Sequence, residues 1–576
     1  MLISDDQLAK ILLENQLVTQ EKLKKANEVA KRKNLSFYNA IIDQDLITDE
    51  QFGRLIADFL KFPFVNLSKH SIDPEVLNIV PEVVAKKQKI ISFAQDKDGL
   101  KLAMNDPANR EVVSFLQKKT GENILIHFAT SKDINEALHL YKKNLQISFE
   151  DLLKEKVDEA GKTAQKEAPI SKILDLLIEY AYQNKASDIH IEPEEEKSLV
   201  RYRIDGVLHD VLNFPRTLHD QIITRIKVLS RLRTDEHLSA QDGKMQFKLE
   251  EENLDIRVSI VPIVNGEKAV LRLLSSRSRQ FALNGLGVSE KDLAKITDAF
   301  TKPYGMILAT GPTGSGKTTT IYAILKILNT RDKNIATIED PVEYDIEGIN
   351  QIQANPKTNL TFADGLRSIL RQDPDIIFVG EIRDQETAGI AVNSAMTGHL
   401  VLSTLHTNNA STALLRLIDM KIEPFLVAST INVIIAQRLV RQICEKCKTS
   451  YELKITGSKL ETTSKEKRLQ SSPEEIPISS LGPHLTKLFA NKKSIRIYRG
   501  KGCTLCHQTG FLGRIAIFEV LTITEEIRKL IMAKADSDSI EKKAIEEGMK
   551  TLLDDGLDKI ERGITTIEEV IRVTKE

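Results

Sequence analysis

Hydrophobic and polar positions near the start of the chain follow the same order twice. Residues 11–23 (ILLENQLVTQEKL) match residues 40–52 (AIIDQDLITDEQF) at a constant offset of 29 positions. In each copy an apolar helix end is followed by Thr19 or Thr48, whose hydroxyl can cap the next helix. The pattern predicts a duplicated helical element, and because the unit occurs only twice, a solenoid is not expected.

The following stretch mixes strand and helix patterns. Residues 61–145 combine short apolar runs (KIISFA, GLKLAM, ILIHFA) with helical stretches, which predicts a small α+β module that closes a first domain at residues 1–145. Residues 151–167 are charged and nearly lose their apolar positions, as in a flexible tether or a solvated helix. The sequence does not choose between these two, and we place the linker at residues 146–168.

A second α+β domain is expected at residues 169–285. Apolar residues recur at helical spacing over residues 170–182, and SDIHIEP and VRYRIDGVLHDV then alternate in the two-residue period of strands. The next segment, LDIRVSIVPIVNGEKAVLRLL, consists of two apolar strands around an Asn-Gly dipeptide. That dipeptide suits a type I′ turn, so the segment predicts a hairpin.

The expected hairpin brings two arginines together. With a two-residue turn at positions 265–266, Arg257 faces Leu274 and Arg272 faces Ser259, so both arginines lie on one face. A proline in the first strand can shift this register. Taken alone, two arginines on a sheet are more often surface charge than catalytic groups.

The strongest chemical signal lies at residues 305–318, GMILATGPTGSGKT, which indicate a buried strand, a glycine-rich loop and the start of a helix. Glycines let backbone N–H groups surround phosphate oxygens, Lys317 neutralises the β- and γ-phosphates, and the Thr318 hydroxyl reaches Mg²⁺. The loop predicts nucleotide binding but does not by itself specify hydrolysis. The expected nucleotide-binding residues are Gly311, Pro312, Thr313, Gly314, Ser315, Gly316, Lys317, Thr318 and Thr319.

Acidic residues follow two further apolar strands. The run DIIFVG at residues 375–380 ends in Glu381, where a carboxylate can hold Mg²⁺ or its water. The segment IATIEDPVEY opens from a short strand into a turn that contains Glu339, Asp340 and Glu343. Hydrolysis needs a group that orients or deprotonates the attacking water. Spacing alone does not choose among these three acids.

Another apolar strand, Leu400 to Thr404, is flanked by His399 and His406. Single histidines are usually structural. Two histidines that bracket a core strand next to a phosphate loop indicate a sensor of the γ-phosphate.

The chain has four cysteines, which form two C-x-x-C pairs. Cys447 and Cys503 are 56 positions apart, and the two pairs together supply the four thiolates of a tetrahedral structural Zn²⁺ site. A redox function would need only one pair. We expect Cys444, Cys447, Cys503 and Cys506 to bind zinc in a tetracysteine element at residues 440–510.

Composition narrows the class of protein. The chain has 576 residues with 81 basic and 82 acidic side chains, so no general attraction to nucleic acid or anionic membrane is expected. The start, MLISDDQLAK, has acids where a signal peptide needs basic residues, and no apolar run reaches the ~18 residues of a membrane span. We therefore expect a cytoplasmic protein of several domains.

Several motifs together resemble one family. SDIHIEP, RIDG, GPTGSGKTTT, TIEDPVEY, DPDIIFVGEIRD, GHLVLSTLHTN and the two C-x-x-C pairs resemble the secretion ATPase superfamily, from about residue 170 to the C-terminus. The N-terminal extension and the tetracysteine element bring the resemblance nearest to the pilus assembly and type II secretion ATPases. It implies an α/β fold: a RecA-like P-loop NTPase core at residues 286–526, preceded by a PAS-like α+β domain at 169–285 and followed by a helical region at 527–576.

The resemblance also implies roles for individual residues. It implies a homohexamer with ATP at the subunit junctions, with Glu343 as the water-activating residue and Glu381 as an atypical Walker B acid. Arg257 and Arg272 would be arginine fingers, and such a finger contributes ~10³–10⁵ in rate in other NTPases. His406 is counted with the catalytic residues.

The N-terminal duplication resembles a domain that binds cyclic di-GMP in some relatives. Those copies begin with Arg-Leu-Gly and have a glycine before the apolar pair, whereas here the first copy begins with Gln7-Leu8-Ala9, and Gln16 and Asp45 stand at the glycine positions. We therefore do not expect cyclic di-GMP binding. The expected role of the domain is docking onto a membrane-associated partner.

The resulting prediction is a hexameric motor that uses ATP, Mg²⁺ and Zn²⁺ at the cytoplasmic face of the inner membrane. It would power type IV pilus assembly through an inner-membrane platform protein. Type II secretion is an alternative that these motifs do not separate. A nucleic-acid motor is the alternative from a different class, and balanced charge without a basic stripe argues against it. A scaffold that binds ATP without turnover is disfavoured by the complete set of Lys317, Glu343 and Glu381.

Overall fold

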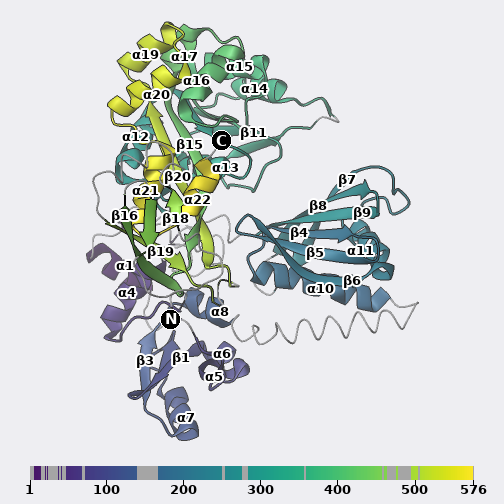
Figure 1. Cartoon of the computed structure of the whole chain (residues 1–576), viewed down its shortest axis with the longest axis vertical. Helices are drawn as coiled ribbons and strands as arrows, with labels where there is room; N and C mark the ends of the chain where they lie inside the picture. Colours follow the sequence, from purple (N-terminus) through teal and green to yellow (C-terminus); the bar gives the residue numbers. More distant parts are fainter. Residues whose placement is uncertain are drawn as a thin grey trace. The chain divides into compact units, whose positions relative to one another are not determined.

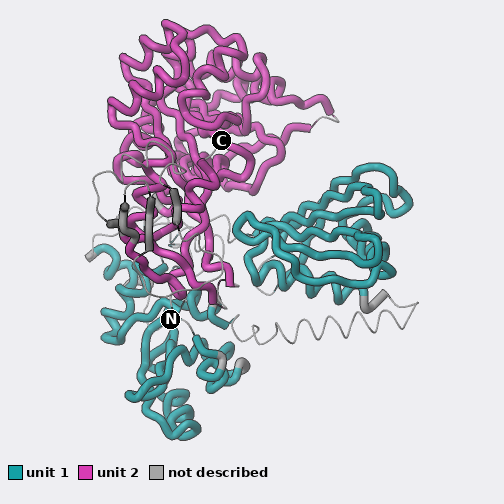
Figure 2. The backbone as a smooth tube through the Cα atoms, viewed as in Figure 1, with its two compact units in different colours: residues 1–280 teal, residues 281–576 magenta. Residues whose placement is uncertain are grey.

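The computed structural model divides into two compact units, residues 1–280 and residues 281–576 (Figure 1, Figure 2). Apart from a few internal positions, it describes residues 5–14, scattered positions from 18 to 47, and then residues 49–138, 167–275, 283–456, 459–462, 475–477 and 494–574.

The duplicated element has a repeated core. Helices α1 (Asp5–Glu14) and α4 (Asp49–Leu60) belong to this region. Equivalent positions of the two copies are buried in the same cluster of apolar side chains: Leu8 and Phe37, Leu12 and Ile41, Val18 and Ile47, Leu23 and Phe52. Each of these pairs has the predicted offset of 29 positions. The repeat in the sequence is therefore also a repeat in burial.

A small α+β module follows, as the sequence predicts. Its three-stranded sheet has the order β1-β2-β3, in which β1 and β2 are antiparallel and β2 and β3 are parallel. A parallel pair needs a crossover connection, and here a helix supplies it. The elements are α5 (Pro74–Leu77), α6 (Glu82–Gln88), β1 (Ile90–Asp96), β2 (Gly99–Met104), α7 (Arg110–Thr120), β3 (Ile124–Phe128) and α8 (Ser131–Leu138). The charged segment at 151–166 lies outside the described residues.

The second α+β region is an antiparallel sheet covered by helices on one face. The sheet has the order β6-β5-β4-β9-β8-β7. One face packs against α10 and α11 in a single apolar cluster, and the strands alternate buried and more exposed positions because neighbouring side chains point to opposite faces. The elements are α10 (Glu167–Gln183), β4 (Asp188–Pro193), β5 (Lys197–Ile204), β6 (Val207–Pro215), α11 (Arg216–Leu229), β7 (Gln241–Lys248), β8 (Asn253–Ile263) and β9 (Gly266–Leu274).

The β8–β9 hairpin forms, but the predicted register is wrong by two positions. Ile263 pairs with Gly266, so the turn residues are Val264 and Asn265 rather than 265–266. Gly266 instead closes the turn with a positive φ of 123°, a backbone conformation that glycine adopts easily. As a result, Arg257 lies directly opposite Arg272. The prediction that both arginines share one face is confirmed.

The second unit is built on a seven-stranded sheet of order β12-β11-β13-β14-β10-β15-β20. All neighbouring pairs are parallel except β15 and β20. Strands β10, β11, β13 and β14 are buried along their whole length, as expected for a parallel sheet with helices on both faces. The strands are β10 (Gly305–Thr310), β11 (Ile335–Glu339), β12 (Asn350–Gln353), β13 (Ile376–Val379), β14 (Leu400–Leu405), β15 (Ile431–Ile443) and β20 (Phe511–Thr522).

Helices cover this sheet and begin at polar caps. Ser289, Thr361, Asp384 and Asn409 each accept a hydrogen bond from a backbone N–H in the first turn of the helix that follows. Before the first strand come η4 (Leu283–Leu286) and α12 (Glu290–Thr301), and between the strands lie α13 (Lys317–Leu328), α14 (Phe362–Leu370), α15 (Gln385–Met396), α16 (Ala410–Asp419) and α17 (Pro424–Thr430).

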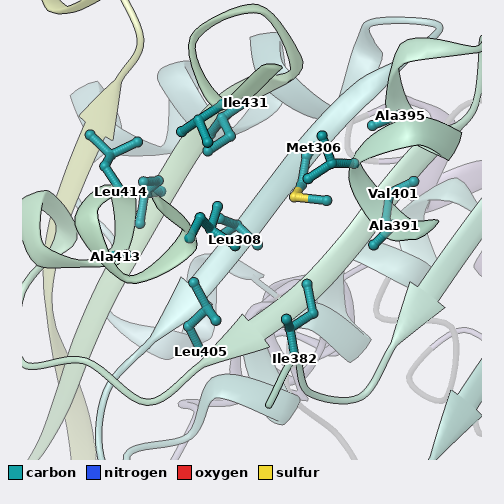
Figure 3. Close-up of a cluster of buried hydrophobic side chains, with 14 of the residues drawn as sticks. Met306, Leu308, Ile382, Ala391, Ala395, Val401, Leu405, Ala413, Leu414 and Ile431 are labelled. Atoms are coloured by element: carbon teal, nitrogen blue, oxygen red, sulfur yellow. The ribbon is translucent and has the colours of Figure 1, made fainter. Parts of the chain in front are cut away.

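An apolar core on one side of the sheet holds the central strands in place. Met306 and Leu308 of β10 and Val401 and Leu405 of β14 are fully or almost fully buried. Small alanines of α15 and α16 pack against them, which lets these helices approach the sheet closely (Figure 3). The strand ends that carry the site are thus anchored in a close-packed core.

Further strands and a helical region complete the unit. Strands β16 (Lys448–Thr456) and β19 (Ser494–Gly500) pair as an antiparallel extension beside the four cysteines, together with β17 (Lys459–Thr462) and β18 (Glu475–Pro477). The C-terminal helices are α19 (Glu525–Met532), α20 (Ser537–Glu546), α21 (Leu552–Glu561) and α22 (Ile567–Thr574). Glu569 of α22 accepts hydrogen bonds from Arg441 of β15 and from Arg572, which ties the last helix to the sheet.

Candidate active site

The glycine-rich loop lies at the carboxyl end of β10 and leads into α13, as predicted. Gly311, Gly314 and Gly316 all have positive φ. At Gly316, a Cβ atom would lie 2.7 Å from the side-chain nitrogen of Gln437, so any larger residue would collide with this support. The loop therefore needs glycine for its conformation and for its close packing on β15.

Lys317 is the first residue of α13 and is largely buried. Its Nζ donates hydrogen bonds to the carbonyl oxygens of Gly311 at 2.7 Å and Pro312 at 3.0 Å. Burial lowers the pKa of Lys317 to about 8, the Glu381 carboxylate opposes this shift, and the Arg438 guanidinium adds to it. The lysine and Glu381 are thus close enough to interact electrostatically.

Gln437 supports the loop from β15 and was missed by the sequence analysis. Its Nε2 donates to the Ser315 carbonyl at 2.7 Å, and its Oε1 accepts from the Thr320 hydroxyl at 2.8 Å. Next to it, Arg438 donates to the carbonyl of Asn408 at 2.8 Å. The available signal was a Gln-Arg pair inside the mostly apolar run INVIIAQRLV.

Glu381 lies just after β13, at the edge of the sheet that also carries the phosphate loop. The carboxyl ends of β10, β14 and β13 lie next to one another because these strands are parallel neighbours. One carboxylate oxygen of Glu381 lies 2.5 Å from the Arg383 guanidinium, and the other lies 3.3 Å from Nε2 of His406. The predicted Glu381 and His406 are therefore brought together.

The two histidines that bracket β14 lie at opposite ends of the strand. His399 precedes β14, and its Nδ1 lies 3.0 Å from the Ser394 carbonyl at the end of α15. His406 follows β14 at the edge that carries the phosphate loop. His406, at 3.3 Å from Glu381, therefore lies with the other candidate site residues.

A pair of threonines joins the phosphate-loop strand to the segment after β14. The Thr310 hydroxyl lies 2.6 Å from the Thr407 hydroxyl, and the Thr407 N–H donates to Thr310 at 3.0 Å. On the other side, Thr404 donates to the Gly380 carbonyl at 2.6 Å. Hydrogen bonds thus connect the ends of β10, β14 and β13.

The acidic turn after β11 contains acids in different environments. Glu339 is only 2% exposed and is held by three side-chain donors, whereas Asp340 is exposed and Glu343 is partly exposed. Burial raises the pKa of Glu339, and hydrogen bonds from Thr337, Tyr322 and Gln351 oppose the shift. Exposure therefore separates Glu339 from the two acids that water can reach.

The arginines of the first unit lie on the polar face of their sheet. Arg272 is 61% exposed along its side chain, and its Nε donates to Asp188 at 2.9 Å. Arg203 lies 3.4 Å from the other oxygen of the same carboxylate. Asp188 is buried between the two. This carboxylate contacts Arg272, which lies directly opposite Arg257 on the polar face of the sheet.

The four cysteines come together from two distant segments. Their sulfur atoms all lie within 4.8 Å of one another, and three of the separations are 3.6, 3.8 and 3.8 Å. A tetrahedral ion with sulfur ligands at ~2.3 Å requires sulfur separations of about 3.8 Å. The Cys503 and Gly510 N–H groups also donate to the Cys506 sulfur. The geometry fits one tetrahedral metal ion.

Comparison with known proteins accounts for most of the chain. A family described as "Type II/IV secretion system protein" matches residues 163–572. The chain belongs to this family. A second family, the MshEN domain, matches residues 60–146.

The chain is similar over nearly its full length to relatives of two kinds. It is 37% identical to the "Type IV pilus assembly ATPase PilB" of Myxococcus xanthus, over 98% of each chain. It is 38% identical to the "Type II secretion system protein E" of Xanthomonas campestris, over 100% of this chain and 99% of the relative. Among solved structures, the ATPase DotB of Legionella pneumophila is 22% identical over 69% of this chain and 94% of its own, with a TM-score of 0.49.

These matches confirm the prediction of a secretion-type ATPase with a RecA-like P-loop NTPase core and a separate N-terminal domain. In the described part of this secretion ATPase, no helix is both long and apolar enough to cross a bilayer.

Proposed function

We propose that this chain is the ATP-driven motor of type IV pilus assembly. The observation that carries the proposal is the alignment over 98% of both chains with a pilus assembly ATPase, combined with a complete phosphate-loop site. The N-terminal region, the ATPase core and the cysteine element are all within that alignment. The similarity therefore extends well beyond a shared nucleotide-binding fold.

In this proposal the phosphate loop, residues 311–319, binds ATP, with Lys317 against the terminal phosphates. Thr318 and Glu381 would hold Mg²⁺, which neutralises phosphate charge. Glu343 orients and deprotonates the attacking water, because it is the family's water-activating position and water can reach it. His406, next to Glu381, senses the terminal phosphate.

Arg257 and Arg272 would act as arginine fingers on the nucleotide. In this proposal, six copies form a ring with ATP at the subunit junctions. The direct pairing of the two arginines across β8 and β9, with Asp188 holding one of them, supports a shared role in binding an anion. The cationic guanidinium groups stabilise charge that develops on the transferred phosphoryl group.

The cysteine element and the N-terminal domain have supporting roles in this motor. The four cysteines hold a structural zinc ion. The N-terminal domain docks onto a membrane-associated partner without binding cyclic di-GMP, and the ring acts on an inner-membrane platform protein from the cytoplasmic side. Sulfur separations of 3.6 to 3.8 Å support the zinc site.

Type II secretion is the second candidate. Relatives named as type II secretion proteins are 38–43% identical, and one of them aligns over nearly the full length of both chains. Deletion of the gene in its host separates the two functions. Loss of surface pili in electron micrographs supports the first candidate, and intact pili with loss of secreted proteins supports the second.

The biochemical test is Mg²⁺-dependent ATP hydrolysis by the purified chain and by Glu343→Gln. A matched control is Glu347→Gln, which changes an exposed carboxylate of the same loop. We expect turnover in the wild type and in the control, loss in Glu343→Gln, and no response to single-stranded or duplex DNA. Strong stimulation by DNA would refute the secretion motor in favour of a nucleic-acid motor.

A further inference from the structure

The acidic turn contains a carboxylate that the proposed chemistry does not use. Glu339 is the last residue of β11 and is only 2% exposed. It accepts hydrogen bonds from Tyr322, from Thr337 at 2.6 Å and from Gln351 at 3.2 Å. A buried carboxylate is costly without such donors, so three of them around one group indicate an organised polar centre.

The donors come from three different elements. Tyr322 lies on α13, the helix that begins at Lys317 of the phosphate loop. Thr337 lies on β11 itself, and Gln351 lies on β12 at the edge of the sheet. Glu339 therefore links the helix that follows the phosphate loop to two strands.

The same centre also binds the turn that carries Glu343. Gln351 accepts from the Ile346 N–H at 2.7 Å and donates to the Tyr344 carbonyl at 3.2 Å. The rings of Tyr322 and Tyr344 pack edge to face with their centres 4.7 Å apart. The positions directly after Glu343 are thus tied to α13 and β12.

Tyr322 has a second link to this turn. Burial raises the pKa of the Tyr322 hydroxyl, the Glu339 carboxylate raises it further, and a hydrogen bond with the backbone of Glu343 acts in the opposite direction. The phenol thus donates to the buried carboxylate and is near enough to the backbone of the proposed water-activating residue to respond to it.

We propose that Glu339 is a positioning residue that, through Tyr322, Thr337 and Gln351, fixes the turn carrying Glu343 against the helix that begins at the phosphate loop. The inference rests on the proposed function of Glu343 and deepens it. Glu339 is too buried to meet the attacking water, and its two oxygens are already occupied by donors. Its effect on turnover passes through the placement of Glu343, and a displacement of about 1 Å can cost about 100-fold in rate.

Tyr322→Phe is the most conservative test because it removes one oxygen atom and keeps the ring between Tyr344 and Phe378. We expect kcat to fall by about tenfold or more, while KM for ATP changes less than about twofold, because the phosphate loop itself is untouched. Tyr304→Phe is the matched control, since it removes the same atom from an exposed tyrosine just before β10. Unchanged kcat in Tyr322→Phe would overturn the inference.

A double-mutant cycle distinguishes positioning from general destabilisation. If Tyr322 acts by placing Glu343, Tyr322→Phe has no further effect on the residual turnover of Glu343→Gln. If it loosens the whole site, it lowers turnover by the same factor in both backgrounds, and the inference fails. Full turnover in Glu343→Gln would refute the proposed role of Glu343 as the water-activating residue. Loss in Glu343→Gln with full turnover in Tyr322→Phe refutes only the positioning role.

A second variant keeps the proposal testable if Tyr322→Phe does not fold. Thr337→Val is nearly isosteric and removes a different donor to the same carboxylate. Variants whose thermal transitions match the wild type should show the kcat loss together with faster hydrogen exchange at residues 340–349. A folded Thr337→Val with unchanged kcat and unchanged exchange would overturn the proposal.

Discussion

Replacing Glu519 by Gln should remove a large pH dependence from the stability of the second unit. Glu519 lies on β20 with 3% exposure, and its Oε1 accepts the Ala410 N–H at the start of α16 at 2.7 Å. Burial raises the pKa of Glu519 to about 7, with a further increase from Glu541 and opposing effects of the Ala410 and Leu552 backbone and of Arg438. The glutamine keeps the acceptor for Ala410 but cannot ionise.

Proton linkage determines the direction and the size of this change in unfolding free energy with pH. The folded pKa of about 7 lies above the unfolded value of 4.5, so the stabilisation from the neutral acid is fully present below pH 4.5 and is lost as the pH rises through 7. A shift of this size corresponds to about 3 kcal/mol of unfolding free energy, of which about 2 kcal/mol is lost between pH 5.5 and 8. In a unit of this size that is a fall in Tm of roughly 4 °C.

Calorimetric melting of the full chain from pH 5.5 to 8 provides the assay, with Glu519→Gln in parallel. Other groups titrate in both proteins, so the difference between the two Tm curves isolates Glu519. We expect the wild type to lose stability relative to the variant as the pH rises through this range. Parallel curves, or a difference that changes in the opposite direction, would show that the carboxyl group is not held neutral by burial.

Two other perturbations test the supports of the site. Gln437→Leu removes one contact with the phosphate loop, at Ser315, and one with α13, at Thr320, whose hydroxyl stays buried. We therefore expect ATP affinity to fall about tenfold in a fluorescent-nucleotide titration, whereas Gln442→Leu on the same strand should not change it. Elemental analysis should find one zinc ion per chain. The Cys503→Ser variant should lose this ion and melt at a lower temperature. A wild-type protein that contains no zinc and still has full stability would contradict the metal site.

Local signals allowed the phosphate loop to be predicted correctly from the sequence. Strand, glycine loop and helix are contiguous over residues 305–318, and each part has its own pattern of residue types. The strands that carry Glu381 and His406 were equally clear because parallel core strands are continuously apolar. The neighbouring positions of these residues then follow from the topology of the parallel sheet.

The hairpin register shows where such signals fail. The Asn-Gly pair was correctly associated with a turn, but pairing begins at Ile263 and Gly266, so Val264 and Asn265 occupy the turn. The side chain of Val264 is fully exposed there, which a local hydrophobic pattern would not indicate. Cross-strand packing along the rest of the ladder determines the register.

Long-range contacts explain why the sequence did not identify Gln437 or distinguish Glu339 from Glu343. Gln437 follows Ser315 by more than a hundred positions, and it becomes a support of the phosphate loop only because β15 pairs with β10. Glu339 and Glu343 have the same chemistry and lie four positions apart, so only their burial in the fold separates them. Burial of a single polar residue depends on tertiary packing, which the sequence pattern does not specify.

The antiparallel ladder of β15 and β20 has a consequence for insertions and deletions in this chain. Ala436 faces Glu519, and Gln437 faces Phe518, while the cysteine pairs lie just beyond the end of the ladder where Ile443 meets Phe511. Length changes between Cys447 and Cys503 leave this alignment intact. One extra residue inside β20 ahead of Glu519 would instead turn Glu519 to the opposite face of the sheet. Natural variation in length should therefore accumulate between the two cysteine pairs and be excluded from β20.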